Sequence, residues 1–192
     1  MGRTRWPIST GTGGRIRRNV QTLGIAVHVT AEPSATEFGE LIRSCQGTIR
    51  GKALALAVAA DRTLHVETEI VPRLASGAVV MTDRYVQSSL VLQRPDGLSA
   101  DDIWSYNLHV LPPLVSFCLS DDPAVIRRRL RDRPHLDRLE EQHSPELQLA
   151  LYREAMDFLR GKGWLQFCID CHERTPEAIG SEIVRRVDEV SQ

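Results

Sequence analysis

Lysine is scarce in this chain of 192 residues, since its 24 basic residues include only Lys52 and Lys162. Neither lysine is followed by Ser or Thr, so the sequence has no segment of the form G-x-x-x-x-G-K-[ST], whose amides and lysine hold nucleotide phosphates. The glycine-rich segment 11–14 supplies flexibility without a lysine charge. We interpret it as a turn, with phosphate binding as the lesser alternative.

Acidic residues are missing from residues 1–31, which carry five arginines: Arg3, Arg5, Arg15, Arg17 and Arg18. An arginine-rich, acid-poor start is typical of organelle transit peptides, yet no clear amphipathic apolar face accompanies these arginines. We expect residues 1–20 to be poorly ordered. The whole chain has a net charge of -1 with both signs mixed, which argues against a surface dedicated to nucleic acid or to a membrane.

Long hydrophobic runs are also missing. No segment approaches the roughly 18 uninterrupted apolar residues of a membrane span, and no apolar secretory core stands near the start, so we expect a cytoplasmic protein. The four cysteines do not form a disulfide framework in a chain of this length. Cys168 and Cys171 have the spacing of a redox or metal pair, but no second pair accompanies them, and we interpret them as buried or half-buried thiols.

The sequence does contain an alternation of β-rich and helical segments. Strands are predicted at 25–30, 78–82, 114–119 and 164–169, and helices at 36–45, 52–74, 99–109, from 123 into an arginine run, at 145–159 and at 176–190. Strands that alternate with helices form a parallel sheet covered on both faces. No repeat or low-complexity segment interrupts the pattern, so we predict one α/β domain over residues 1–192.

Charged residues stand where two of the predicted strands end. Asp83 and Arg84 follow the apolar strand at 78–82, and Glu32 follows the strand at 25–30. Ligands of open α/β sheets bind at the carboxyl ends of the strands. An Asp-Arg pair in this place can also cap the next helix, which is the structural alternative to a binding site.

Four segments, in this order, resemble the thymidylate kinase family. They are the E-P-S turn at 32–34, the A-D-R helix segment at 60–62, the D-R-Y strand end at 83–85 and the arginine-rich segment at 127–140. The resemblance covers roughly residues 20 to 190. It implies a P-loop NTPase-like nucleoside monophosphate kinase fold, here with an incomplete first strand and loop. It also implies an enzyme that uses Mg²⁺ and transfers the γ-phosphate of ATP to dTMP, and a homodimer formed through the region 52–74.

The resemblance also assigns roles to individual residues. It implies that Asp83 is catalytic and serves Mg²⁺ and the reacting phosphates, and that Glu32 reaches the metal through water. Arg84 holds the acceptor's phosphate, because the planar fork of arginine donates in pairs to phosphate oxygens. Arg62 meets the thymine base, and Val58 stands one helical turn earlier, where the family has an aromatic residue that stacks on the base.

Further residues complete the predicted site. Tyr85 and Ser89 belong to the acceptor site, and Ser9 and Thr10 are interpreted as a remnant of the phosphate loop. Segment 127–140 is interpreted as a lid that closes over the donor phosphates and stabilises charge in the transition state. The candidates for the catalytic lid arginine are Arg129, Arg131 and Arg133.

Two alternatives stay open. Val58 in place of an aromatic residue reduces stacking to an apolar contact, which permits a kinase for another nucleoside monophosphate. The missing lysine and loop permit a catalytically inactive nucleotide-binding homologue, or the product of a truncated reading frame.

Overall fold

The computed structural model describes residues 26–45, 47–132, 140–141 and 143–191. Its strands are short and each is parallel to a partner: β1 (Val27–Ala31) pairs with β2 (Val79–Asp83), and β3 (Ser116–Ser120) pairs with β4 (Gln166–Asp170). The predicted strand positions are confirmed to within two residues at each end.

Within the residues that the structure describes, the four strands form two sheets of two strands each. Every pairing is parallel, as expected from the sequence. Side chains connect β2 to β3 instead, because Met81 and Phe117 both pack against an apolar cluster centred on Ile169, Ile179 and Ile183. Apolar contact of this kind holds elements together without a ladder of backbone hydrogen bonds.

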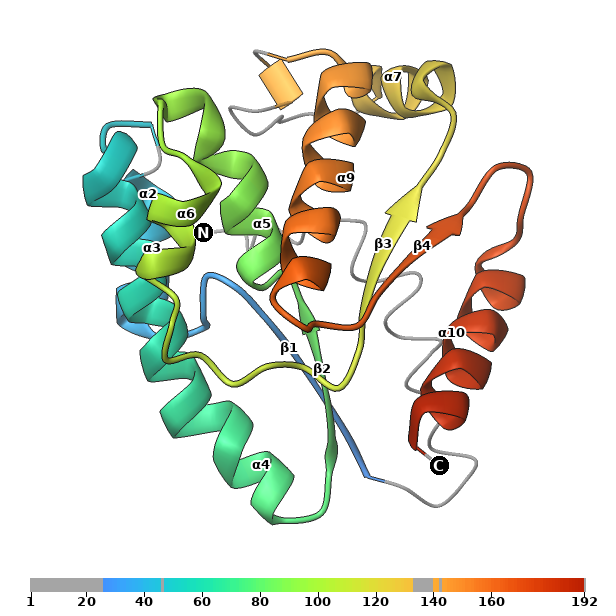
Figure 1. Cartoon of the computed structure of the whole chain (residues 1–192), viewed down its shortest axis with the longest axis horizontal. Coiled ribbons are helices and arrows are strands. Elements are labelled where there is room, and N and C mark those ends of the chain that lie inside the picture. Colours follow the sequence, from blue (N-terminus) through green and yellow to red (C-terminus); the bar gives the residue numbers. More distant parts are fainter. Residues whose placement is uncertain (1–25, 46, 133–139, 142, 192) are drawn as a thin grey trace.

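Helices connect the strands and cover both faces of β2. The elements are α2 (Glu37–Cys45), α3 (Gly51–His65), a π-helical turn (Val66–Ile70), α4 (Val71–Ala75), α5 (Val86–Leu92), a 3-10 turn (Arg94–Asp96), α6 (Ala100–Ser105), α7 (Pro123–Arg131), α9 (Pro145–Gly161) and α10 (Pro176–Ser191). Val80 packs against an apolar cluster formed by α5 and α9. Met81 packs against the cluster centred on Ile169, Ile179 and Ile183. Because successive side chains of a strand point to opposite faces, helices cover both sides, as predicted. In Figure 1, α9 runs beside α5, and α10 lies beyond β4.

The predicted helix at 52–74 consists of three segments. α3 ends at His65, the π-helical turn follows, and α4 begins at Val71. Pro72 has no backbone N–H, so it cannot donate within an ordinary α-helical ladder. In the π turn the N–H of Val71 donates to the carbonyl of Val66, five residues earlier, and the chain enters Pro72 from this wider turn.

Two other helices differ from the sequence-based expectation. α5 was not expected from the sequence pattern, yet Val86, Leu90 and Val91 are completely buried, so tertiary packing stabilises this short helix. The helix expected at 99–109 is shorter, because α6 ends at Ser105. The side-chain amide of Asn107 then donates to the carbonyl of Ile103 over 2.7 Å and satisfies an acceptor near the helix end.

Several predicted features lie outside the described residues. These are the poor order of residues 1–20, the glycine-rich segment 11–14, Ser9 and Thr10, and Arg133 with half of the lid segment 127–140. Among the helices that the structure describes, none is long and apolar enough to cross a membrane. The assignment of residues 1–192 to a single domain stays a prediction.

Candidate functional site

The carboxyl ends of β1 and β2 lie side by side. Ala31 is in register with Asp83, and the N–H of Glu32 donates to the carbonyl of Asp83 over 3.0 Å. The next residue, Arg84, has φ 70°, a left-handed conformation that non-glycine residues rarely adopt. Strained backbone of this kind gathers at ligand-binding sites, where the fold holds it in place. The structure thus brings three of the predicted site residues to one sheet edge.

Arg62 of α3 joins this edge from the side. Its side chain is buried, and each of its nitrogen atoms donates to a different residue: Nε to Glu32 Oε2 at 2.7 Å, Nη1 to Asn107 Oδ1 at 2.5 Å and Nη2 to Ser89 Oγ at 3.0 Å. Buried arginine is stable only when its charge and its donors are satisfied. The partners come from three separate parts of the chain, so they fix the plane of the guanidinium.

Tyr85 supports Arg62 from another direction. The guanidinium carbon lies 5.4 Å from the centre of the Tyr85 ring, within the range of a cation–π contact. The phenol donates to the carbonyl of Leu111 over 2.9 Å. Burial and then the Glu32 carboxylate raise the pKa of Tyr85 above its ordinary value, and Arg62 opposes them only in part. Tyr85 therefore stays a neutral hydrogen-bond donor at physiological pH.

Asp61, beside Arg62 in the sequence, has a structural role. Its carboxylate is buried and accepts from the N–H of Ser34 and from the Ser34 hydroxyl, both at 2.6 Å. Two hydrogen bonds to one buried residue fix the E-P-S turn against α3. Both Asp61 and Arg62 are buried, so they do not form a surface ion pair. Val58 lies half-buried one turn before Arg62.

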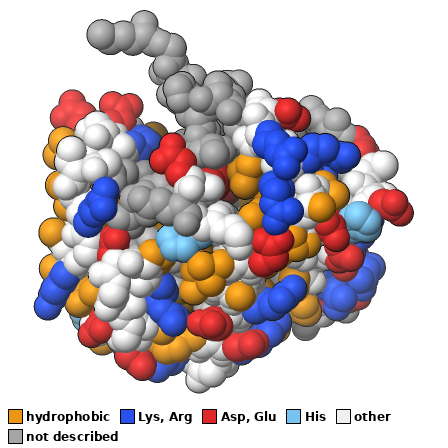
Figure 2. Space-filling model, turned by 90° about the horizontal axis from the view of Figure 1, so that it is seen from above, with side chains coloured by type: hydrophobic (Ala, Val, Ile, Leu, Met, Phe, Trp, Pro, Cys, Tyr) orange, Lys and Arg blue, Asp and Glu red, His pale blue; other side chains and the backbone are white. Residues whose placement is uncertain are grey.

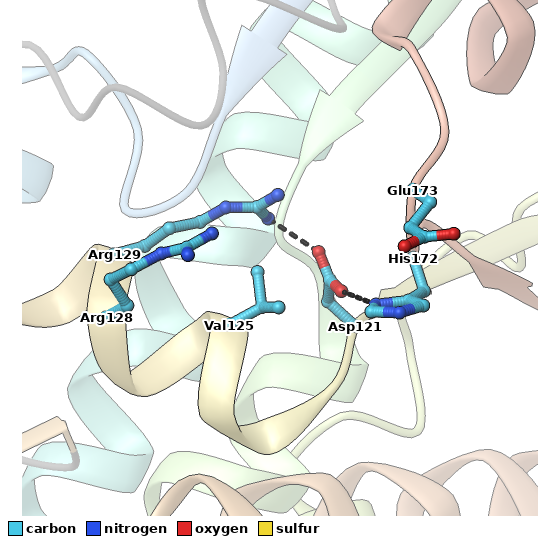
Figure 3. A pocket seen from close by; sticks show the side chains of 6 residues that line it. All are labelled: Asp121, Val125, Arg128, Arg129, His172 and Glu173. Carbon is cyan, nitrogen blue, oxygen red and sulfur yellow. Dashed lines mark hydrogen bonds and ion pairs between the residues drawn. The ribbon is translucent and has the colours of Figure 1, made fainter.

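The arginines of α7 belong to a second cluster, at the ends of β3 and β4. Arg129 and Arg131 are exposed on α7, and Nη1 of Arg129 lies 2.8 Å from Oδ2 of Asp121, just after β3. Nδ1 of His172, just after β4, lies 3.3 Å from the other oxygen of Asp121. Figure 3 shows the Asp121 carboxylate between the side chains of Arg129 and His172. Figure 2 views this end of the molecule, where Lys and Arg side chains gather over α7.

A hollow of about 350 Å³ lies at this second cluster. Its lining residues are Asp121, Val125, Arg128, Arg129, His172 and Glu173. Two guanidinium groups on one wall suit an anionic or planar ligand, because arginine both pairs with phosphate oxygens and stacks on rings. A volume of this size is at the lower end of ordinary small-molecule sites.

The sequence-based prediction did not include Asn107, Asp121 or His172. Asp121 and His172 follow β3 and β4 directly, so the rule that ligands meet the carboxyl ends of strands could have indicated them. Asn107 had no such signal, because it reaches Arg62 only through tertiary packing across 45 positions of the sequence.

The carboxylates of Glu32 and Asp83, at the ends of β1 and β2, fit a magnesium ion only in part. Asp83 stands at the end of β2, but one oxygen of Glu32 already accepts from Arg62. In the described part of the chain, no group of three or more His, Cys, Asp or Glu is placed to hold a metal. Magnesium that is bound with substrate phosphates needs only one or two protein carboxylates and keeps several waters. Direct ligation by Asp83 with Glu32 behind a water is compatible with this arrangement.

The thiols at the end of β4 differ from the expectation in one respect. Cys171 is half-buried, but Cys168 is exposed. Cys168 lies opposite Cys118 of β3 in the strand register, whereas Cys171 packs against the cluster on α10. Burial, and then the charges of Cys168 and Cys171, raise the pKa of Cys118 to about 12.

Comparison with known sequences identifies the family. The family model for thymidylate kinase matches residues 10–183 of this chain. The chain belongs to the thymidylate kinase family. Relatives include a probable thymidylate kinase from Pyrobaculum calidifontis, 36% identical over 118 residues, which covers 60% of this chain and 61% of the relative. Another from Staphylothermus marinus is 34% identical and covers 62% and 61%, and a thymidylate kinase from Clavibacter sepedonicus is 37% identical and covers 65% and 64%.

These matches have a limited length. The matched region spans a little over 60% of the relatives from Pyrobaculum and Staphylothermus. The parallel strands and surrounding helices are consistent with the P-loop NTPase-like fold expected of this family. Family membership and α/β fold class, both predicted from the sequence, are thus confirmed.

Proposed function

We propose that the protein is a nucleoside monophosphate kinase that transfers the γ-phosphate of ATP to dTMP. The observation that supports this most strongly is the buried Arg62, fixed by Glu32, Ser89 and Asn107 beside the ends of β1 and β2. A guanidinium has five N–H donors, and these three partners each accept from one. We propose that the other two N–H groups donate to carbonyl oxygens of a bound base.

Arg84 supplies the second contact of the proposed acceptor site. Arg84 directly follows the strand end Asp83, and we propose that its guanidinium binds the acceptor phosphate at this sheet edge. The attacking oxygen belongs to that phosphate and is already ionised at neutral pH, so no strong general base is required. Binding and orientation by Arg62 and Arg84 therefore account for much of the chemistry that the described residues perform.

Magnesium is the metal that the family implies, and Asp83 is the residue proposed to hold it, with Glu32 acting through water. The ion supplies neutralisation of negative charge on the phosphates. The Glu32 carboxylate, which Arg62 holds by a 2.7 Å contact, is proposed to orient a metal-bound water rather than to ligate the metal directly.

The donor nucleotide is proposed to lie at the second cluster. The hollow between α7 and the loop after β4 carries Arg128 and Arg129 on one wall and His172 on another. Nη1 of Arg129 lies 2.8 Å from the Asp121 carboxylate, so ligand phosphates would compete with Asp121 for the Arg129 guanidinium. Arg129 and Arg131 stay candidates for the catalytic lid arginine, and Arg133 lies outside the described residues.

The proposal is tested by ADP release with ATP, Mg²⁺ and each nucleoside monophosphate in turn. Since the sequence has no G-x-x-x-x-G-K-[ST] segment, we expect turnover below that of an intact site by about 10²–10³, the cost of losing one preorganised donor. Turnover should be highest with dTMP and should be lost in Asp83→Asn.

Calorimetry should also detect dTMP binding at least about tenfold tighter than thymidine, the size of one charge-assisted contact. Equal affinity for the two would contradict the role of Arg84.

A homodimer is proposed as the assembly, through one side of α3 and α4. Exposed apolar side chains recur there at helical spacing: Leu56, Leu64, Val71 and Leu74, which are 45%, 36%, 46% and 42% exposed. Leu56 and Leu64, eight residues apart, share one face of α3, and Val71 and Leu74, three apart, share one face of α4. We propose that the two pairs form one stripe. A stripe of this kind is self-complementary across a two-fold axis, and we propose that a second copy of the chain covers it.

A further inference from the structure

His65 is the most completely enclosed titratable side chain near the proposed acceptor site. It is 0% exposed and ends α3 next to the carboxyl end of β1. Its Nδ1 lies 3.4 Å from Oε1 of Glu32, and its Nε2 lies 2.8 Å from the hydroxyl of Thr30 and 3.5 Å from Oε2 of Glu69. An imidazole buried without partners would be costly, so these contacts define its orientation.

Hydrogen-bond accounting assigns a proton to Nδ1. A carboxylate oxygen only accepts, so the nitrogen that faces Glu32 must be a donor to interact favourably. The other nitrogen, Nε2, lies 2.8 Å from the Thr30 hydroxyl, which can donate or accept, and 3.5 Å from Oε2 of Glu69, which only accepts. The tautomer with hydrogen on Nε2 alone would direct a lone pair at the Glu32 carboxylate. The contact with Glu32 is therefore favourable only when His65 carries a hydrogen on Nδ1.

Glu32 is thus held through both of its oxygens by one helix. Oε2 accepts from Arg62 at 2.7 Å, and Oε1 faces His65 at 3.4 Å. If only Oε2 were held, the carboxylate could rotate about its last side-chain bond. That rotation would tilt the Arg62 guanidinium bound to Oε2. The contact with His65 limits this rotation and so keeps the Arg62 guanidinium in one plane.

The π-helical turn after α3 fixes the outer side of His65. Glu69 lies four residues after His65, a spacing that places the two side chains on one helix face. Oε1 of Glu69 also accepts from Nε2 of His28 at 2.7 Å. Such π turns are often found at functional sites.

We propose that His65 is a positioning residue for nucleotide binding: its Nδ1–H holds Glu32 against Arg62 and so orients the guanidinium that meets the acceptor base. The inference rests on the proposed function in naming the acceptor as dTMP. The contact between His65 and Glu32 itself does not depend on that name.

Two substitutions separate this role from simple packing. The side-chain amide of His65→Asn places a donor near the position of Nδ1, whereas that of His65→Gln places a donor near the position of Nε2. Calorimetry with dTMP should give His65→Asn an affinity within about threefold of the parent, and His65→Gln an affinity at least about tenfold weaker, the size of one contact to a charged group. Equal losses in both variants, or a larger loss in His65→Asn, would overturn the proposal.

A second measurement decides the inference even if the parent protein does not bind dTMP, a result that would refute the proposed function alone. Glu32→Ala is made in both the His65→Asn and His65→Gln proteins, and the change in Tm is measured. Glu32→Ala should lower Tm more in the His65→Asn background, because only that background keeps the donor toward Glu32. Glu67→Ala, which changes an exposed residue of the same π turn, is the control and should lower Tm equally in both. An equal effect of Glu32→Ala in the two backgrounds would refute the positioning role.

Discussion

Nε of Arg62 donates to Oε2 of Glu32 over 2.7 Å, and the two side chains are only 2% and 4% exposed. The residues are 30 positions apart in the sequence, so the pair forms only when α3 packs against the end of β1. In a buried pair, each charge is compensated mainly by its partner, because water cannot reach it. One contact therefore serves both the stability of the fold and the geometry of the proposed acceptor site.

The first prediction concerns the charge of Glu32. Glu32→Gln keeps the shape of the side chain but leaves the buried Arg62 without its counter-charge, and it should lower the free energy of unfolding by about 3 kcal/mol. Urea denaturation measures the loss. The control is Glu146→Gln, which removes a carboxylate 2.6 Å from Arg127 in a pair that is about half exposed, and it should cost less than about 1 kcal/mol. Losses of equal size would show that burial adds nothing to the Arg62 pair.

A second prediction separates strain from binding at Arg84. Glycine adopts the observed φ of 70° freely, so Arg84→Gly should be as stable as Arg84→Ala or more stable, by up to about 1 kcal/mol. Both variants should bind dTMP at least about tenfold more weakly, because both lack the guanidinium. Urea denaturation and calorimetry give the two quantities. Parent-like affinity in Arg84→Gly would remove Arg84 from the acceptor site.

A third prediction concerns acid stability at Glu69. Burial alone would raise the pKa of Glu69, but hydrogen bonds from His28 and Thr30 and the charges of His65 and His28 lower it below its ordinary value of 4.5. The folded protein then binds this proton more weakly than the unfolded chain does. The contribution of Glu69 to stability is therefore present above about pH 4.5 and is lost as the pH falls through its lower, folded pKa.

Glu69→Gln should accordingly be less stable than the parent at pH 6, and the difference should shrink as the pH falls below 4.5. Thermal unfolding across this range measures it. Glu67→Gln changes an exposed residue of the same turn and serves as the control, with a nearly constant difference. A Glu69→Gln difference that is constant with pH would contradict the lowered pKa.

A fourth prediction distinguishes the paired cysteines of β3 and β4. The thiolate is the reactive form, and burial raises the pKa of Cys118 to about 12, so very little thiolate exists there at neutral pH. Iodoacetamide at pH 7.5 should therefore alkylate the exposed Cys168 well before Cys118, as measured by peptide mass spectrometry. In urea-unfolded protein the two rates should become similar. Equal rates in the folded protein would show that Cys118 is accessible and ionised.

The fifth prediction tests the proposed dimer surface. Leu64→Glu places a charge in the middle of the apolar stripe on α3 and α4, and it should convert a dimer into monomers in sedimentation experiments. Leu114→Glu is the matched control, because Leu114 is 60% exposed just before β3, away from the stripe, and should leave the assembly unchanged. A monomeric parent protein, or a dimer that survives Leu64→Glu, would refute the proposal.

Much of the proposed acceptor site could be predicted from the sequence because it follows local patterns. Asp83, Arg84 and Glu32 stand directly after apolar strands, and parallel strands bring their carboxyl ends to one edge. Arg62 and Val58 are one helical turn apart, which the helical period alone places on one face. The motifs that carry the family resemblance are likewise short segments, and the match over residues 10–183 confirmed the family that they indicated.

The rest depended on long-range packing. The sequence alone determined the α/β class, the strand positions and the family, because hydrophobic period and short motifs are local properties of the chain. Only the tertiary structure decided that the strands pair in two sheets, that Asn107 meets Arg62, and that His65 faces Glu32. Those contacts join residues 33 or 45 positions apart, and their burial and direction arise from how helices and strands pack, which local pattern does not determine.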